Sequence, residues 1–125
     1  MKIWAIENES SVKHLLTLPP FNSSVMALSW VGLDRNRNDG LIAVGMENGL
    51  IELWSLSARR AEDGSVGVSG ASCGLVVRFD PFMCHISAVH RLAWRESEKS
   101  EDSLSLELGS CGADHCVRVF EVSFT

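Results

Sequence analysis

A repeat of short apolar motifs constrains the fold of this chain more than any other feature. The motif VxxLxW at residues 25–30 returns at 89–94, 64 residues later. The motif NGLIELW at 48–54 returns 66 residues later as DHCVRVF at 114–120, and KIW at 2–4 retains a still earlier copy. Each copy combines a strand, a polar loop, a second strand, a tight turn at Asn or Asp and a strand that ends in an aromatic residue. This order predicts a protein built from similar β-units.

Short β-rich runs dominate the chain, and helical periodicity is weak throughout. Gly, Ser, Asn and Asp separate these runs. Pro19 and Pro20 end the second run, because proline has no N–H to donate to a neighbouring strand. The pattern predicts no helix and nine short strands, at residues 1–6, 12–18, 25–31, 41–46, 50–56, 75–80, 89–95, 104–111 and 116–122.

Polar insertions obscure the length of the repeat. Segment 58–74 contains four Gly and three Ser, and it is predicted to be a flexible surface loop between two strands. Segments 31–40 and 95–103 are predicted to be polar loops at equivalent positions in two copies. Removing about 20 inserted residues brings the period near the roughly 40–45 residues of a four-stranded propeller blade.

The composition is that of an ordinary globular domain or part of one, with 46 % apolar and 22 % charged residues in a chain of 125. Eleven Lys and Arg against 16 Asp and Glu give a net charge of −5. An acidic chain is a poor candidate for unaided nucleic-acid binding, which needs a basic surface. No apolar run approaches the roughly 18 residues of a membrane-spanning helix.

The four cysteines, Cys73, Cys84, Cys111 and Cys116, form no Cys-x-x-Cys pair. The first ten residues contain no apolar core of the kind found in signal peptides, so we expect reduced thiols in a cytosolic or nuclear protein. A zinc site is the alternative, with candidate ligands Cys84, His85, Cys111, His115 and Cys116. Their spacing matches no structural zinc pattern, so we expect no bound metal.

The last copy resembles the WD-repeat family. Residues 84–94 (CHISAVHRLAW) stand where that family has Gly-His-x-x-x-Val-x-x-Leu-x-Trp, and 110–114 (SCGAD) stand for its Ser-Gly-Ser-x-Asp. The resemblance implies a buried hydrogen-bonded tie between His85, Ser110 and Asp114. Phe120 stands at the position of the family tryptophan and has no N–H to donate, so the last link of the tie should be missing.

The earlier copy departs further from the family pattern. Phe21, Val44 and Asn48 replace the His, Ser and Asp, and only Trp54 remains. We expect this unit to rely on apolar packing. The equivalent strand positions of the aromatic residues place four side chains in the predicted blade core: Trp30, Trp54, Trp94 and Phe120.

A closer resemblance is to the WD-repeat subunits of the Elongator complex. The stretches LIAVGMENGLIELW, HISAVHRLAW and SCGADHCVRVFEV carry it. The fold it implies is all-β, a partial WD40-type β-propeller with about one complete four-stranded blade flanked by two incomplete ones. Residues 1–18 would end one blade, 22–82 would form the complete blade, and 84–124 would form a last blade without its outer strand. We expect such a piece, expressed alone, to expose sheet edges and to aggregate.

The resemblance implies a non-catalytic scaffold with no cofactor and no metal. Its partners would be the other Elongator subunits, the large scaffold subunit and the catalytic subunit, in a complex that modifies wobble uridines of tRNA. The expected location is the cytoplasm and the nucleus, with no membrane contact and no direct nucleic-acid contact by this segment. The alternatives are a WD-repeat adaptor in a signalling or chromatin complex and, less favoured, a hydrolase built on a propeller.

Several residues permit a second interpretation. His85 and Asp114 could form a catalytic dyad, although the sequence indicates no nucleophile or oxyanion site beside them. The arginine pairs at 35 and 37 and at 59 and 60 could contact RNA, but neighbouring acidic residues neutralise them. The acidic segment 95–103 could meet a basic surface on a partner.

Overall fold

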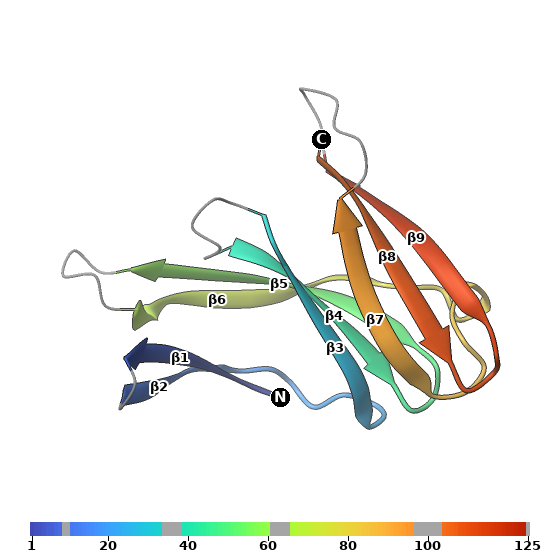
Figure 1. Cartoon of the computed structure of the whole chain (residues 1–125). Coiled ribbons are helices and arrows are strands. Elements are labelled where there is room, and N and C mark those ends of the chain that lie inside the picture. The colour runs from blue at the N-terminus through green and yellow to red at the C-terminus, as the bar shows by residue number, and fades with distance from the viewer. Residues whose placement is uncertain (9–10, 34–38, 61–65, 97–103, 125) are drawn as a thin grey trace.

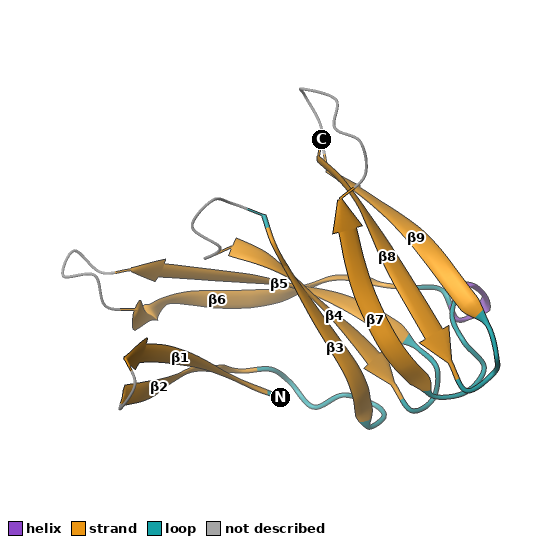
Figure 2. Ribbon diagram, viewed as in Figure 1, coloured by secondary structure: helices purple, strands orange, loops and turns teal. Residues whose placement is uncertain are grey.

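The computed structural model describes residues 1–8, 11–33, 39–60, 66–96 and 104–124. These residues form nine strands and one short 3₁₀ turn, arranged in three antiparallel sheets (Figure 1, Figure 2). The all-β prediction is confirmed, and the three sheets are compatible with blades of a partial WD40-type β-propeller. Within the described ranges, no helix is long and apolar enough to cross a membrane.

Each sheet is a meander in which strands that follow one another in sequence are paired. The first sheet holds β1 (Lys2–Asn8) and β2 (Ser11–Thr17). The second holds β3 (Val25–Gly32), β4 (Asp39–Met46), β5 (Ile51–Arg60) and β6 (Val66–Arg78). The turn η1 (Pro81–Met83) leads to the third sheet, formed by β7 (Val89–Glu96), β8 (Leu104–Gly112) and β9 (Val117–Phe124).

The prediction of a loop at 58–74 was wrong. Strand β5 runs to Arg60 and β6 begins at Val66, and Arg60 pairs with Val66 at the far end of the hairpin. The Gly- and Ser-rich composition suggested a loop, but small residues can occupy a strand when a neighbour supplies backbone partners. Here the long partner strand β5 does so, and the two strands extend well beyond the rest of the second sheet (Figure 1).

The core lies on both faces of the second sheet. On one face, Ile51 and Leu53 of β5 join residues of the third sheet in a cluster that includes Val89, Leu108 and Phe120. On the other face, a second cluster contains Leu18 together with side chains of β4 and β5: Ile42, Val44, Met46 and Trp54. Side chains alternate between faces along a strand, so an unbroken apolar run such as 41–46 fits a strand covered on both sides. All six of these residues are buried.

The sheets stack in chain order. Strand β7 packs against β3 and β4, and β2 packs against β6. One polar contact crosses between the second and third sheets, where the Trp94 Nε1–H donates to the Ser29 carbonyl oxygen at 3.0 Å. The three sheets therefore follow one another like neighbouring blades (Figure 1).

Three of the four aromatic residues predicted for the core pack there, and Trp30 does not. Trp54 and Phe120 are buried, and Trp94 is half-buried against the cluster between the second and third sheets. Trp30 is 41 % exposed. Trp94 packs against strand β3 of the preceding sheet, but the described part of the first sheet packs against β6 and so does not cover Trp30 in the same way. The Trp30 indole instead covers Gly40, where an added Cβ would clash with its ring.

Candidate functional site

The third sheet contains a buried polar network centred on His85. The His85 Nδ1 lies 2.9 Å from Asp114 Oδ1, and its Nε2 lies 2.8 Å from Ser110 Oγ. His85 follows η1, Ser110 is on β8, and Asp114 is in the β8–β9 turn. At Gly112 an added Cβ would lie 2.8 Å from His85 Nδ1, so only glycine leaves room for the ring. The structure thus brings together the three residues of the predicted tie.

Asp114 connects this network to the backbone of two segments. Its Oδ2 accepts from Ile86 N–H at 3.1 Å, and its Oδ1 accepts from Cys116 N–H at 3.1 Å. The hydrogen bond from His85 lowers the pKa of Asp114 to about 2, with these two N–H donors adding to the effect and burial opposing it. Because the ionised carboxylate can only accept, His85 Nδ1 carries the proton of this hydrogen bond, and the other ring nitrogen, Nε2, faces the Ser110 hydroxyl.

The order of contacts, Ser110 to His85 to Asp114, is that of a hydrolase triad, but the site lacks access. His85 is 2 % exposed and Ser110 is 3 % exposed, so a substrate cannot reach the hydroxyl oxygen. A catalytic serine also needs hydrogen-bond donors around the carbonyl oxygen of its substrate, and the sequence indicates no such oxyanion site here. The network therefore fits a structural tie that fastens the segment before β7 to the β8–β9 turn.

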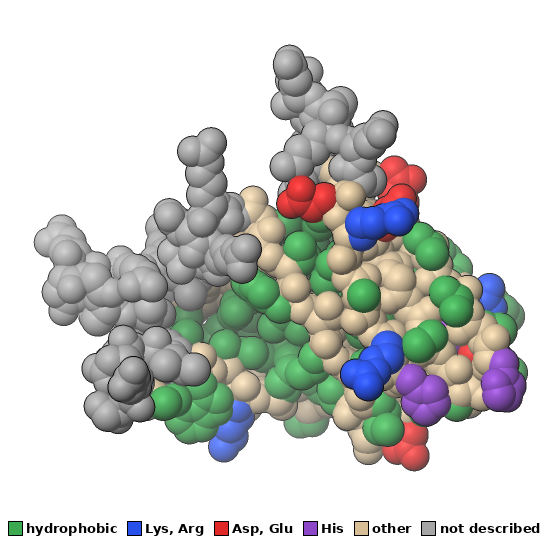
Figure 3. Space-filling model, in the orientation of Figure 1, with side chains coloured by type: hydrophobic (Ala, Val, Ile, Leu, Met, Phe, Trp, Pro, Cys, Tyr) green, Lys and Arg blue, Asp and Glu red, His purple; other side chains and the backbone are tan. Residues whose placement is uncertain are grey.

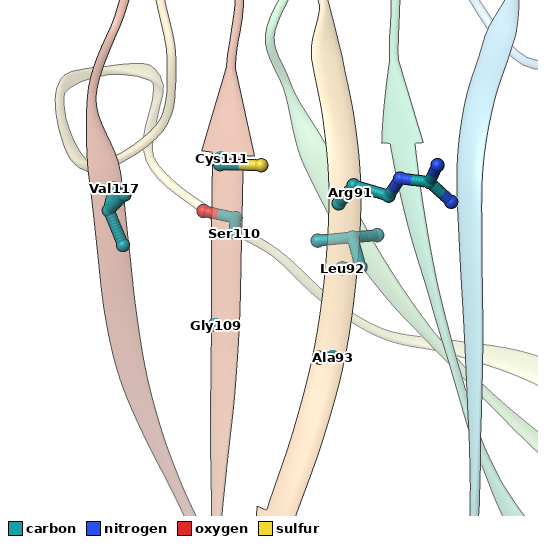
Figure 4. A pocket seen from close by; sticks show the side chains of 7 residues that line it. All are labelled: Arg91, Leu92, Ala93, Gly109, Ser110, Cys111 and Val117. Carbon is teal, nitrogen blue, oxygen red and sulfur yellow. The ribbon is translucent and has the colours of Figure 1, made fainter.

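A shallow hollow of about 210 Å³ lies on the outer face of the third sheet, behind this network. Figure 4 shows its lining on β7, β8 and β9, made by Arg91, Leu92, Ala93, Gly109, Ser110, Cys111 and Val117. Its exposed surface is apolar, and Ser110 sends its hydroxyl to His85 on the buried side. The Ser110 hydroxyl is therefore not presented to the hollow, whose lining includes the free thiol of Cys111.

The equivalent position in the second sheet is apolar. Phe21 packs edge-on against Trp54 with ring centroids 5.9 Å apart and planes at 82°. Val44, in the place of Ser110, is fully buried beside them. The Trp54 Nε1 atom is buried and has no hydrogen-bond partner among the described residues. A buried unpaired donor costs free energy, so the Trp54 N–H destabilises this sheet.

The tight turns are similar in both copies although the network is not. Asn48 Oδ1 accepts from Leu50 N–H at 3.1 Å, as Asp114 accepts from Cys116 N–H. Gly49 has φ 91° and His115 has φ 63°, so both turns use the left-handed backbone conformation. The Asn or Asp side chain supports the turn in either setting.

Phe120 ends the polar chain in the third sheet. Its ring stacks on Phe79 with centroids 4.6 Å apart and planes at 21°. It offers Ser110 no donor, in agreement with the absence of an indole from the sequence at this position. The two sheets are thus complementary: one retains His, Ser and Asp without the tryptophan, and the other retains the tryptophan alone.

The candidate zinc ligands show no metal site in the ranges that the structure describes, where no group of three or more His, Cys, Asp or Glu side chains could hold an ion. All four cysteines are free, and burial raises the pKa of the Cys84 thiol. His90 is exposed, and His14 Nε2 lies 2.9 Å from Thr17 Oγ1. Other candidate contact residues lie outside the described residues or side chains: Arg35, Arg37, Arg59, Arg60, Glu98, Glu101 and Asp102.

Two features escaped the sequence interpretation. Glu52 is 4 % exposed and pairs with Arg78, whose Nε lies 3.3 Å from its Oε2. The acidic residue inside the apolar motif at 48–54 was a signal that its buried carboxylate has a basic partner. The second feature is η1, which lies between the predicted strands 75–80 and 89–95 and was not predicted; its Asp-Pro start is a common turn signal.

Comparison with known proteins identifies similar sequences. No protein-family model matches the chain. A protein of Arabidopsis thaliana named "Elongator complex protein 2" is 53 % identical over 99 % of the chain. Proteins of the same name from Dictyostelium discoideum and Rattus norvegicus are 27 % and 32 % identical over 99 % and 66 % of the chain. The chain spans only 14 % of the Arabidopsis protein, 14 % of the Dictyostelium protein and 10 % of the rat protein. The chain therefore resembles one part of Elongator complex protein 2.

Proposed function

We propose that this chain is a non-catalytic propeller segment of an Elongator subunit that supports tRNA wobble-uridine modification. The 53 % identity to a protein named Elongator complex protein 2, over nearly the whole chain, carries the proposal. The partners proposed are the large scaffold subunit and the catalytic subunit of that complex, and the proposed location is the cytoplasm and the nucleus. The proposal assigns no cofactor to this segment.

The polar network supports a structural role. His85 contacts both Ser110 and Asp114, and Asp114 also accepts from the backbone N–H groups of Ile86 and Cys116, so these hydrogen bonds join parts of the protein to one another. Such a tie holds two connections in fixed positions at one end of the third sheet. A rigid array of sheets that presents fixed connections is suited to binding other proteins.

Co-purification tests the assignment to Elongator. The full-length protein that contains this chain, tagged and expressed in its own cells, should retain the large scaffold subunit and the catalytic subunit in stoichiometric amounts. Cells without the protein should lose modified wobble uridines, measured by mass spectrometry of digested tRNA. Purification of the tagged protein without any Elongator subunit would contradict the proposal.

A substitution at Ser110 tests the non-catalytic role. Ser110→Ala removes the hydroxyl oxygen that a hydrolase would need. Expressed in cells without the protein, this variant should restore wobble-uridine modification in proportion to its abundance in the cell. Ser55→Ala is a matched control, because the Ser55 hydroxyl donates to the Gly74 carbonyl oxygen at 3.3 Å in the second sheet. Loss of modification with Ser110→Ala at normal abundance and normal subunit binding would indicate chemistry at this site.

An adaptor in a signalling or chromatin complex is the second candidate. The sheets and their connections could serve any assembly, because the fold alone does not determine the partner. The same co-purification separates the two candidates, since an adaptor of this kind would retain other proteins in place of Elongator subunits.

A further inference from the structure

The tight turn between β4 and β5 contains the dipeptide Asn48-Gly49. Asparagine is among the thermally labile residues of proteins, because the backbone nitrogen of the next residue can attack its side-chain amide. Glycine in that next position has no side chain to shield the nitrogen. Asn48 is exposed. In Figure 1 this turn lies at the same end of its sheet as the β8–β9 turn, and Figure 3 shows charged and histidine side chains at the surface there, so water reaches the turn.

The fold accounts for both residues of this dipeptide. Gly49 has φ 91°, and a Cβ at this position would clash with the His85 carbonyl oxygen, so the turn needs glycine. The Asn48 Oδ1 accepts from Leu50 N–H at 3.1 Å, which closes a ring that contains both the Asn48 Cγ and the Gly49 nitrogen. The matching turn of the third sheet has Asp114 in this position, which carries no amide. The turn of the second sheet therefore keeps near each other the two atoms that deamidation joins.

The closed turn restrains this reaction. Gly49 is buried, and its N–H donates to the Met46 carbonyl oxygen at 3.0 Å. The Asn48 N–H donates to Ser23 Oγ at 3.1 Å, which ties the turn to the segment before β3. A buried nitrogen that donates to a carbonyl can give its proton to a base in solution only when the turn opens locally. The rate of deamidation should therefore follow the population of the open turn.

The same turn fastens the third sheet to the second. The Gly49 carbonyl oxygen accepts from His85 N–H at 3.1 Å. The side chain of His85 contacts Ser110 and Asp114, so this backbone hydrogen bond joins the turn of the second sheet to the polar network of the third. The two segments also pack without room for a Cβ at Gly49. A change in the backbone of the turn therefore acts directly on the contact between the two sheets.

We propose that Asn48 is a site of spontaneous deamidation, and that its isoaspartate product loosens the third sheet from the second. When the turn opens, a hydroxide ion takes the Gly49 N–H proton and the nitrogen attacks the Asn48 Cγ. A bond forms between these two atoms, the bond from Cγ to the side-chain nitrogen breaks, and that nitrogen takes a proton from water and leaves as ammonia. Water then opens the cyclic imide. Cleavage between Cγ and the Gly49 nitrogen gives aspartate, and cleavage between the Asn48 backbone carbonyl carbon and that nitrogen gives isoaspartate.

The two products have different effects on the turn. Aspartate keeps the backbone and an oxygen that can accept from Leu50 N–H, as Asp114 accepts from Cys116 N–H in the third sheet. Isoaspartate places the Cβ in the main chain, so the lengthened backbone moves the Gly49 carbonyl oxygen away from His85 N–H. Isoaspartate should therefore disturb the contact between the sheets, and aspartate should not. The reaction needs only this chain and water, so it does not depend on the partner being an Elongator subunit.

Ageing of the purified full-length protein in mildly alkaline buffer tests the reaction. Peptide mapping by mass spectrometry, with fragmentation that distinguishes isoaspartate from aspartate, should find both products at position 48. Ser23→Ala removes the acceptor of the Asn48 N–H and should accelerate the conversion. Ser55→Ala is the matched control in the same sheet and should leave the rate unchanged. Intact Asn48 after a time in which an unfolded peptide of the same sequence is converted, or equal rates in the wild type and Ser23→Ala, would overturn the proposal.

Hydrogen exchange tests the effect on the sheets. Chromatography of the aged protein separates the isoaspartate form, and its His85 amide should lose protection relative to the unaged wild type. The Asn48→Asp variant contains the aspartate product without ageing, and it should keep this protection. Equal protection of the His85 amide in the isoaspartate form and the wild type, or the same loss in Asn48→Asp, would overturn the assigned effect of isoaspartate. Neither measurement involves a partner protein, so a failure here leaves the co-purification result standing.

Discussion

The buried Trp54 N–H offers a direct test of how the second sheet replaces a hydrogen-bonded network with apolar packing. Val44 stands where the third sheet has Ser110, and both Val44 and Trp54 belong to the same buried cluster. Val44→Thr keeps the shape of the side chain and adds a hydroxyl oxygen. That oxygen can accept from the Trp54 Nε1–H, which has no partner among the described residues.

The expected size of the effect follows from the burial of both groups. A buried hydroxyl without a partner costs about 1–3 kcal/mol, and a buried N–H without a partner costs a similar amount. If the two groups meet, both costs fall. In a Trp54→Phe background the new hydroxyl has no indole to accept from, so Val44→Thr should be more destabilising there. We expect a coupling free energy of about 1–3 kcal/mol between the two substitutions.

Native-state hydrogen exchange of the β4 and β5 amides in the full-length protein measures this coupling locally. The four proteins of the cycle are the wild type, each single variant and the double variant. Val89→Thr is a matched control, because Val89 is also fully buried but belongs to the other cluster. Additive effects of Val44→Thr and Trp54→Phe, within about 0.3 kcal/mol, would refute the reasoning.

Three further predictions concern the third sheet. His85→Ala should destabilise it by about 1–3 kcal/mol in chemical unfolding, because the Asp114 carboxylate and the Ser110 hydroxyl lose a buried partner; an unchanged midpoint would contradict the tie. The pKa of Asp114 is lowered to about 2 from its ordinary value near 4, so its contribution to stability is present above about pH 4 and is lost as the pH falls towards 2. Acid unfolding should show this loss, and Asp114→Asn should remove it from the titration. Val117 and Val119 are 74 % and 67 % exposed, so the 125-residue polypeptide alone should self-associate, and Val117→Lys/Val119→Lys should reduce its sedimentation coefficient towards that of a monomer.

Most of the strands could be predicted from the sequence because the strand and turn motifs occur twice, at 25–30 and 48–54 and again at 89–94 and 114–120. Strands β4 and β5 were predicted from the apolar run at 41–46 and from the β-rich run at 50–56. The resemblance also pointed to His85, Ser110 and Asp114, which the structure places in contact. These signals are local in sequence or tied to a motif of fixed spacing.

The failures arose where a neighbouring strand or sheet decides the outcome. Segment 58–74 has the composition of a loop, and its pairing with β5 makes much of it a strand. Trp30 and Trp94 share a motif, yet only Trp94 has the preceding sheet to pack against, so their exposures differ. The Glu52–Arg78 pair joins two strands 26 residues apart in sequence, a distance at which no local pattern operates. Composition and motif cannot report such contacts, because the contacts depend on which surfaces meet.

The polar set of the third sheet and the apolar set of the second sheet cannot easily be converted into each other by single mutations. A histidine at position 21 would meet Val44, which offers its ring no hydrogen-bond partner, and a serine at position 44 would meet the ring of Phe21. In the third sheet, a valine at position 110 would leave the His85 Nε2 buried without its present partner. Each of these single substitutions therefore gives a less stable protein, whereas replacing all members of a set together gives side chains that again fit one another. The buried Trp54 N–H has no partner among the described residues to lose, so a change of Trp54 to phenylalanine breaks no hydrogen bond of the second sheet.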